Sequence, residues 1–189
     1  DVPSDISSAA FFMVAAAITG SRLELTGLDM QDTQGDKEVV SLLEQMGCRT
    51  EQTDTGIIIE GPQNVGSAGG SSGGSAARSS STGTGLRGGV FDLNNIPDAL
   101  PALSVAACFS RETVELRNVP QARQKETDRI AVMHRELTKL GAEIEEVEDG
   151  LIINGRGGLH NAPKRGLRGG AVAGHEDHRV IMALSVAGL

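Results

Sequence analysis

The segment GAEIEEVEDGLIINGRG at residues 141–157 decides the fold, because a similar segment, GCRTEQTDTGIIIEG, occurs at residues 47–61. Gly150 of the second segment aligns with Gly56 of the first. In both, two short runs meet at a polar turn, Glu-Asp-Gly or Asp-Thr-Gly, which is typical of a β-hairpin. The match therefore predicts two copies of one structural unit, each ending in a hairpin.

The repeat continues upstream of the hairpins. Three more pairs of segments match in order: LLEQMG with ELTKLG (42–47, 136–141), SRLELTGL with ETVELRNV (21–28, 112–119), and FMVAAAI with LSVAACF (12–18, 103–109). A second spacing relates two further pairs: GLRGGVF with GLRGGAV (85–91, 166–172), and ALSVAAC with ALSVAGL (102–108, 183–189). The chain thus contains two copies of the unit, followed by the first strand and helix of a third.

The period of the apolar residues predicts the elements of each unit. Residues 8–19 and 99–109 are apolar on all sides and of helix length, so we expect buried helices. RLELTGL and TVELRNV alternate like half-buried strands. A second helix in each copy should carry one apolar stripe and stop at a glycine, Gly47 or Gly141. The stripes are Val39, Leu42 or Leu43 and Met46 in one copy, and Ile130, Met133, Leu137 and Leu140 in the other. The unit is β-α-β-α-β-β, an α/β class in which sheets surround buried helices.

Composition excludes several functions. With 25 acidic and 17 basic residues and a net charge of −8, the chain lacks the basic footprint of a nucleic-acid-binding protein. The longest apolar run, residues 9–18, is shorter than the roughly 20 residues that span a bilayer, and no basic segment precedes it as in a signal peptide. We therefore expect no nucleic acid and no membrane partner. Cys48 and Cys108 are expected to be buried thiols in a reducing compartment, the cytoplasm or, in a plant or alga, the plastid.

Residues 66–85 differ from the rest of the chain. Apart from Arg78 they are all Gly, Ser, Ala or Thr, a composition that cannot build a core. We expect a flexible surface insertion without a chemical role, within one domain that covers residues 1–189.

Three residues fall at the start of the three buried helices when the repeats are aligned: Ser7, Asp98 and Arg179. A helix N-terminus attracts anions, and for Asp98 a role as N-cap is the simpler interpretation. Arg179 opposes the helix dipole, so we expect an anionic group beside it. His178 is either a proton carrier or a structural histidine.

The segment QKETDRI, residues 124–130, places charges of both signs at the start of one helix. If that helix begins near Glu126, Lys125 and Arg129 project to one side. A solvated ion-pair surface is the alternative. The second copy has three more residues before this helix than the first copy, and those residues are the charged ones, which favours a local concentration of cations for an acidic substrate.

QKETDRI (124–130), NNIPDALPALSVAA (94–107), GHEDHRVIMALSVAGL (174–189) and VPSDISSAAFF (2–12) together resemble the family of 5-enolpyruvylshikimate-3-phosphate synthases. The resemblance covers nearly the whole chain except the Gly/Ser-rich insertion. It implies the inverse α/β barrel of the enolpyruvyl transferases, and transfer of the enolpyruvyl group of phosphoenolpyruvate to the 5-hydroxyl of shikimate 3-phosphate in the shikimate pathway. It implies no metal or organic cofactor.

The resemblance also implies roles for individual residues. Asp98 matches the aspartate that contacts the 5-hydroxyl and is the candidate base. Glu126 matches the glutamate proposed to carry a proton at the methylene carbon of phosphoenolpyruvate. Lys125 matches a lysine on the shikimate side, and Arg129 and Arg179 match arginines that bind phosphoenolpyruvate. These residue types suit general acid–base and electrostatic catalysis.

The sequence departs from the family pattern at three positions: Gln121 replaces the usual Asn, Gln124 the usual Val, and Ser4 the usual Gly. Gln121 and His178 are kept as substrate-binding candidates. The chain resembles most of the C-terminal domain of the family, so we expect the N-terminal domain as its partner. Alone, the 189 residues should be inactive or nearly so. Two alternatives are a relative that acts on UDP-N-acetylglucosamine and a non-catalytic anion-binding domain.

Overall fold

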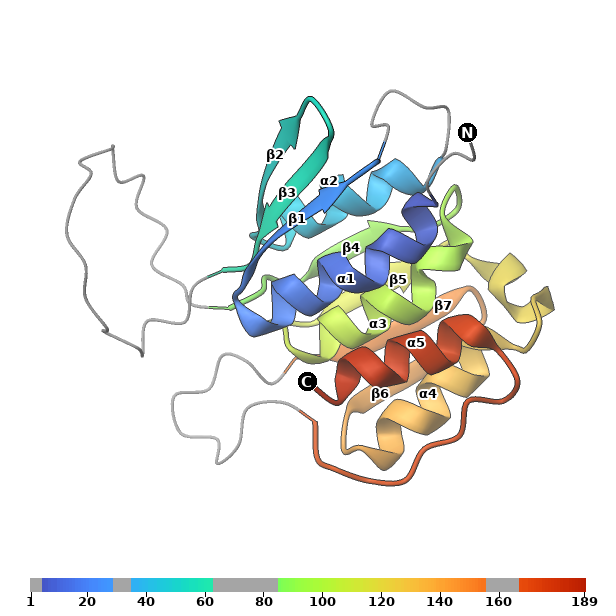
Figure 1. The fold of residues 1–189 in the computed structure, drawn as a ribbon. Helices are drawn as coiled ribbons and strands as arrows, with labels where there is room; N and C mark the ends of the chain where they lie inside the picture. The colour runs from blue at the N-terminus through green and yellow to red at the C-terminus, as the bar shows by residue number, and fades with distance from the viewer. Residues whose placement is uncertain (1–4, 29–34, 63–84, 156–166) are drawn as a thin grey trace.

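The structure is a computed structural model that describes residues 5–28, 35–62, 85–155 and 167–189 (Figure 1). The Gly/Ser-rich insertion predicted at 66–85 lies outside these residues except for Gly85, and Ser4 lies outside them as well. No described helix is long and apolar enough to span a membrane.

The described elements follow the predicted order of the repeat. The first copy contains α1 (Ile6–Thr19), β1 (Arg22–Thr26), η1 (Gly35–Lys37), α2 (Glu38–Gln45), β2 (Arg49–Thr53) and β3 (Gly56–Glu60). The second contains β4 (Gly89–Asp92), η2 (Pro97–Ala99), α3 (Leu100–Cys108), β5 (Val114–Arg117), η3 (Pro120–Gln124), α4 (Arg129–Lys139), β6 (Glu143–Val147) and β7 (Gly150–Asn154). The third begins with α5 (His178–Ala187).

Each copy forms its own sheet, and the three strands that correspond between the copies have the same order in both sheets. The first sheet has the order β1-β3-β2 and the second the order β4-β5-β7-β6. Both predicted hairpins are antiparallel and turn just before Gly56 and Gly150, while β4 and β5 pair in parallel. The predicted α/β class is confirmed.

The strand predicted at 166–172 is wrong for its described part, because residues 167–172 form no strand. In the second copy, the equivalent strand β4 pairs only with β5, which follows α3. The described chain has no strand after α5, so this segment lacks the neighbour that would hold it extended.

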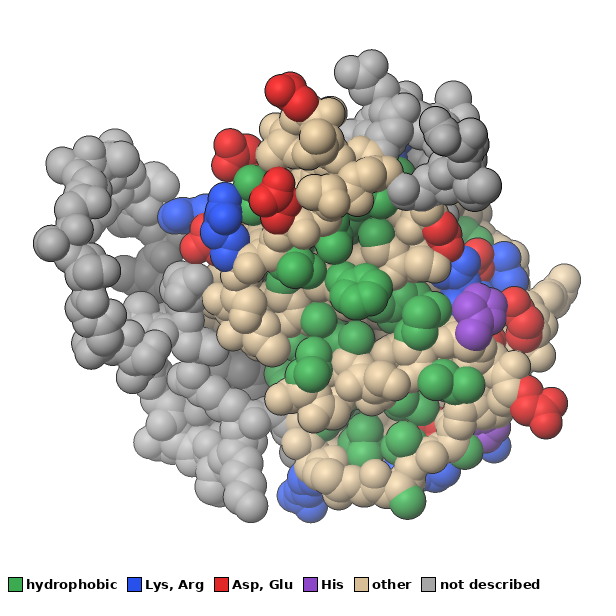
Figure 2. All heavy atoms as spheres, viewed as in Figure 1, with side chains coloured by type: hydrophobic (Ala, Val, Ile, Leu, Met, Phe, Trp, Pro, Cys, Tyr) green, Lys and Arg blue, Asp and Glu red, His purple; other side chains and the backbone are tan. Residues whose placement is uncertain are grey.

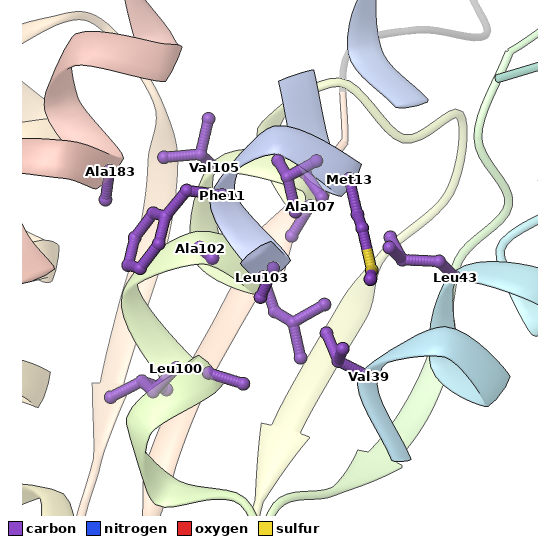
Figure 3. Packing of buried hydrophobic residues seen from close by; sticks show 14 of the residues in the cluster. Phe11, Met13, Val39, Leu43, Leu100, Ala102, Leu103, Val105, Ala107 and Ala183 are labelled. Carbon is purple, nitrogen blue, oxygen red and sulfur yellow. The ribbon is translucent and has the colours of Figure 1, made fainter. Parts of the chain in front are cut away.

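The helices α1, α3 and α5 lie side by side at the centre, with the sheets on one side of them (Figure 1). α3 is buried along its whole length, as its Ala-rich sequence predicts. α2 and α4 are buried on one face only: Val39, Leu43 and Met46 contact the core from one copy, and the predicted stripe of α4 does so from the other. Phe11, Met13, Val39, Leu43 and Leu103 all belong to this core, and Figure 3 shows Met13 of α1 beside Leu43 of α2, whereas Phe11 points the other way, toward Ala183 of α5.

One face of the helical layer is covered by no described element. Figure 2 shows apolar side chains gathered there, and Phe12 of α1 and Ile181 of α5 are 59% and 50% exposed. The cysteines are buried, as predicted; burial, together with the charge of Glu44, raises the pKa of Cys48 to about 12 and keeps this thiol protonated.

The predicted ends of the amphipathic helices α2 and α4 are confirmed, whereas the predicted start of α4 is not. The helices end just before Gly47 and Gly141, which adopt φ angles of 103° and 88°. The expected start near Glu126 is wrong, since α4 begins at Arg129. Asp128 accepts a hydrogen bond from the amide of Ala131 at 3.0 Å, so the best N-cap residue sets the boundary.

The glycines that open β3 and β7 provide a test of this packing. A Cβ atom at Gly150 would lie 1.8 Å from the carbonyl oxygen of Leu116, so β5 and β7 would have to separate. We expect Gly150→Ala to lower the free energy of unfolding by at least about 2 kcal/mol. Gly169→Ala is the control, because no atom lies within 4 Å of its added Cβ. Urea denaturation followed by circular dichroism measures both, and equal midpoints would contradict the steric argument.

Candidate active site

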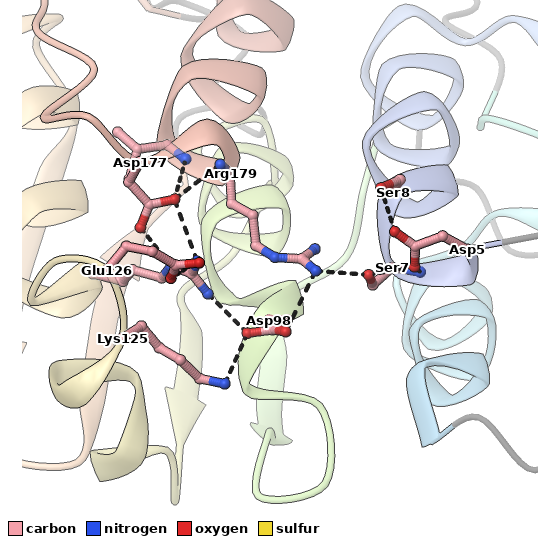
Figure 4. Close-up of polar contacts among 10 residues, drawn as sticks. Asp5, Ser7, Ser8, Asp98, Lys125, Glu126, Asp177 and Arg179 are labelled. Carbon is pink, nitrogen blue, oxygen red and sulfur yellow. Dashed lines mark hydrogen bonds and ion pairs between the residues drawn. The ribbon is translucent and has the colours of Figure 1, made fainter.

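The three equivalent helix starts meet at one place. Arg179, in the first turn of α5, donates from Nη2 to the hydroxyl of Ser7 in α1 at 2.8 Å, and the same nitrogen lies 3.4 Å from Oδ2 of Asp98 (Figure 4). The repeat thus brings residues separated by up to 172 positions into contact. The anionic group expected beside Arg179 is present in the protein itself, as Asp98.

Asp98 is not an N-cap, contrary to the simpler interpretation of its position. It lies inside η2, and the residue that precedes α3, Ala99, makes no side-chain cap. Its carboxylate instead faces three cations: Oδ1 lies 3.1 Å from Nζ of Lys125 and 2.8 Å from Nη1 of Arg129, and Oδ2 faces Arg179. The short turn before the helix aims the side chain away from the helix amides.

The surroundings of Asp98 determine its charge. Partial burial raises its pKa, but the hydrogen bond from Lys125 and the charges of Arg179, Lys125 and Arg129 outweigh burial, so the pKa is lowered. Asp98 is therefore ionised, and it serves first as an acceptor of hydrogen bonds.

Arg129 is the most enclosed charge of the cluster, with 1% of its side chain exposed. Its Nε donates to Asp177 at 2.7 Å and its Nη2 donates to the other oxygen of that carboxylate at 3.3 Å. Its Nη1 donates to Asp98 at 2.8 Å, and its Nη2 also donates to Glu126 at 2.5 Å. A guanidinium with this many hydrogen bonds has its buried charge compensated, and its planar geometry fixes the positions of the carboxylates around it.

Asp177 belongs to this cluster although sequence reasoning did not select it. It is fully buried, caps α5 by accepting from the amides of Arg179 and Val180, and receives the hydroxyl of Thr127 at 3.2 Å. Burial raises its pKa, and the hydrogen bond and charge of Arg129, with the two amides, lower it further than that. An acid directly before an apolar helical pattern was the available signal, as an N-cap.

Lys125 and Glu126 form the open edge of the cluster. Their side chains are 32% and 49% exposed, and both point toward Asp98 and Arg129 rather than away from them (Figure 4). The six charges Lys125, Arg129, Arg179, Asp98, Glu126 and Asp177 balance one another. Nη1 of Arg179 is buried and is without a hydrogen-bond partner in the described part of the chain.

The two remaining candidates lie outside the ionic cluster. Gln121 donates from Nε2 to the carbonyl of Asn94 at 2.8 Å, which joins η3 to the turn after β4. His178 opens α5, is exposed, and forms no hydrogen bond or ion pair with any described residue. Within the described ranges no group of three or more His, Cys, Asp and Glu could hold a metal ion.

The arrangement defines a class of site: buried cations at helix starts, with carboxylates beside them, which suits binding of an anionic substrate and proton transfer. Comparison with known proteins agrees. The family model for EPSP synthase, 3-phosphoshikimate 1-carboxyvinyltransferase, matches residues 1–189. The chain belongs to the EPSP synthase family.

Individual relatives carry the same description. The chain is 46% identical over 188 residues to a 3-phosphoshikimate 1-carboxyvinyltransferase of Ruminiclostridium cellulolyticum and 44% identical to one of Acetivibrio thermocellus. The matches take in 100% of this chain but only 37% of each relative. The solved EPSP synthase of Acinetobacter baumannii superposes with a TM-score of 0.75 at 32% identity, over 99% of this chain and 40% of that one. The resemblance and the enolpyruvyl transferase fold are confirmed.

Asp177→Asn tests the buried pair. Removing one partner leaves the charge of Arg129 buried and less well compensated, so we expect a loss of about 3 kcal/mol in the free energy of unfolding at neutral pH. Asp54→Asn, in the exposed turn between β2 and β3, is the control and should cost little.

The pair also predicts a dependence on pH. Because the pKa values of Asp98 and Asp177 are lowered by folding, the stability they contribute is complete above about pH 4 and is lost as the pH falls through the lowered values. Stability measured from pH 6 to pH 2.5 should therefore fall less steeply in Asp177→Asn than in the wild type. Parallel curves would show that Asp177 does not couple its charge to folding.

Proposed function

We propose that this chain supplies part of the active site of an enzyme that transfers the enolpyruvyl group of phosphoenolpyruvate to the 5-hydroxyl of shikimate 3-phosphate, releasing phosphate. The observation that supports this most directly is the ionic cluster of Asp98, Lys125, Glu126, Arg129 and Arg179 in a member of the EPSP synthase family. In particular, Nη1 of Arg179 is buried and can donate a hydrogen bond to an anion.

In this proposal the cations bind the anionic substrates. Arg179 directs its unpartnered Nη1 at an oxygen of phosphoenolpyruvate, and Arg129 supplies a second guanidinium beside it. Lys125, at the exposed edge, contacts the shikimate side. Such fixed donors stabilise the negative charge of the reacting groups without reorganising during the reaction.

The carboxylates carry the proton transfers. Asp98 accepts the proton of the 5-hydroxyl as its oxygen attacks phosphoenolpyruvate, and Glu126 exchanges a proton with the methylene carbon. In the unliganded protein the cations lower the pKa of Asp98, which makes it a weak base. Phosphoenolpyruvate competes for those same cations and adds negative charge nearby, so its binding raises the basicity of Asp98. Binding of phosphoenolpyruvate thus makes Asp98 a better base for the 5-hydroxyl.

We further propose that residues 1–189 act as one domain of a larger enzyme. The chain spans about 37% of the length of the relatives that it matches, so the other groups that hold shikimate 3-phosphate are assigned to the N-terminal domain. The buried cysteines are consistent with the cytoplasm as the location, or with a plastid in a plant or alga. Gln121 and His178 are retained as substrate-binding candidates that act only when that domain closes the site.

Titration with phosphoenolpyruvate tests the anion site. Amide NMR shifts near Arg179 and Glu126 should saturate, more tightly when shikimate 3-phosphate is present. Because hydrogen bonds to charged groups contribute about 1.5–3 kcal/mol, Arg179→Gln should weaken binding about tenfold or more. Arg49→Gln, on the exposed strand β2, should bind like the wild type. Equal affinity in Arg179→Gln, or no saturable shift at millimolar ligand, would contradict the proposed anion site.

Turnover tests the assignment of the missing groups. Since one domain cannot exclude water from the reaction, the chain alone should release no measurable phosphate from phosphoenolpyruvate in the presence of shikimate 3-phosphate. Phosphate release at an ordinary enzymatic rate would show instead that these 189 residues hold a complete site.

A further inference from the structure

Glu136 is a buried carboxylate that the proposed reaction does not use. It lies on α4 with none of its side chain exposed. Both of its oxygens lie 2.8 Å from Nζ of Lys139, the backbone amide of Ala173 donates to it at 3.0 Å, and Nε2 of His175 lies 2.8 Å away. Two of these three partners belong to the segment that leads into α5. Glu136 therefore links α4 to that segment.

The position of Glu136 on α4 relates it to the active site. Arg129 and Glu136 are seven residues apart, which is two helical turns, so both project from the same face. Arg129 binds Asp177, and Glu136 binds Ala173 and His175. The segment 173–177 is thus held at both of its ends by a single rigid helix.

The segment between these two points has an unfavourable backbone conformation. His175 and Glu176 adopt consecutive φ angles of 51° and 58°, in the left-handed region that residues other than glycine seldom occupy; histidine enters it more readily than most, but glutamate does not. The amide of Asp177 donates to the carbonyl of Gly174 at 3.0 Å and closes the turn. Such a conformation persists only where the surroundings hold it.

Glu136 is charged under all ordinary conditions. Burial raises its pKa, but hydrogen bonds from Lys139, His175 and the amide of Ala173, with the charge of Lys139, lower the pKa to about 2. Among the described residues Arg135 also lies near it, with its Nε 3.8 Å away. The carboxylate is therefore always available as an acceptor for the segment.

We propose that Glu136 is a positioning residue: by holding Ala173 and His175 it fixes the left-handed turn that places Asp177 and Arg179 in the candidate active site. Asp177 follows the turn directly and caps α5, and Arg179 comes two residues later, so a relaxed turn would displace both side chains. The effect of Glu136 on ligand binding rests on the proposed function, whereas its effect on the turn does not.

The first test needs no ligand. In Glu136→Gln, which keeps the shape but loses the charge, the amides of Arg179 and Val180 should exchange with solvent at least about tenfold faster, because their acceptor Asp177 is less well held. The ¹⁵Nε signal of Arg129 should shift as well. Glu145→Gln, an exposed position on β6, is the matched control and should change neither. Wild-type exchange in Glu136→Gln would overturn the proposal.

A rescue variant separates positioning from general stability. Asparagine enters the left-handed region more readily than glutamate, so Glu176→Asn should restore much of the protection lost in Glu136→Gln. Glu176 is exposed, so the substitution does not disturb the core. If exchange instead rises equally throughout α3 and α4 and Glu176→Asn restores nothing, Glu136 is only a stabilising residue and the proposal fails.

A second variant covers the case in which Glu136→Gln does not fold. His175→Ala removes the imidazole that contacts Glu136. This side chain is partly exposed, and the substitution leaves the pair of Glu136 and Lys139 in place. Faster exchange confined to Arg179 and Val180 is expected, and unchanged exchange would overturn the proposal. Phosphoenolpyruvate titration then separates the two ideas. Absence of binding in the wild type contradicts the proposed function, while unaltered binding in a variant with a loosened turn contradicts the positioning of Arg179.

Discussion

The ion pairs of Arg129 are the interaction on which the rest of this site depends. A guanidinium that is 1% exposed must be paired, and its partners come from three different parts of the chain: Asp177 before α5, Asp98 in η2, and Glu126 before α4. Removing any of these carboxylates leaves charge enclosed by protein, which is costly. The ion pairs of Arg129 therefore fix the relative positions of α4, α5 and the start of α3, and with them the side chains of the candidate site.

The repeat explains why such a cluster exists. Each unit begins its buried helix at an equivalent point, and packing α1, α3 and α5 side by side brings the three starts together. Evenly repeated residues would place like beside like, but the three positions have diverged to Ser7, Asp98 and Arg179. A hydroxyl, a carboxylate and a guanidinium now meet at one point. The partial positive charge of the helix amides there adds to the charge of the cations.

The site is electrically balanced before any ligand arrives, and this has a consequence for chemistry. Each cation that would bind a substrate anion is already paired with a carboxylate, so a substrate must compete with Asp98 and Glu126 for Lys125, Arg129 and Arg179. The competition lowers affinity, but it couples binding to the basicity of the carboxylates it displaces. Glu136 and the left-handed turn at 175–176 contribute to the same arrangement, because the paired charges keep their distances only if the segment before α5 is held in place.

The repeat, the order of elements in its first two copies, both hairpins, the glycines that end α2 and α4, and five of the residues in the ionic cluster could be predicted from sequence, since these depend on local pattern and on resemblance. Tertiary structure decided the rest. Asp98 follows a cap pattern but binds cations, because η2 turns it away from the amides of α3. α4 begins at Arg129 because Asp128 competes successfully as N-cap. The N-cap role of Asp177 has a local signal, but its pairing with Arg129 and the contact of Glu136 with Ala173 do not, since each joins residues more than 35 positions apart whose approach depends on helix packing that no local pattern encodes.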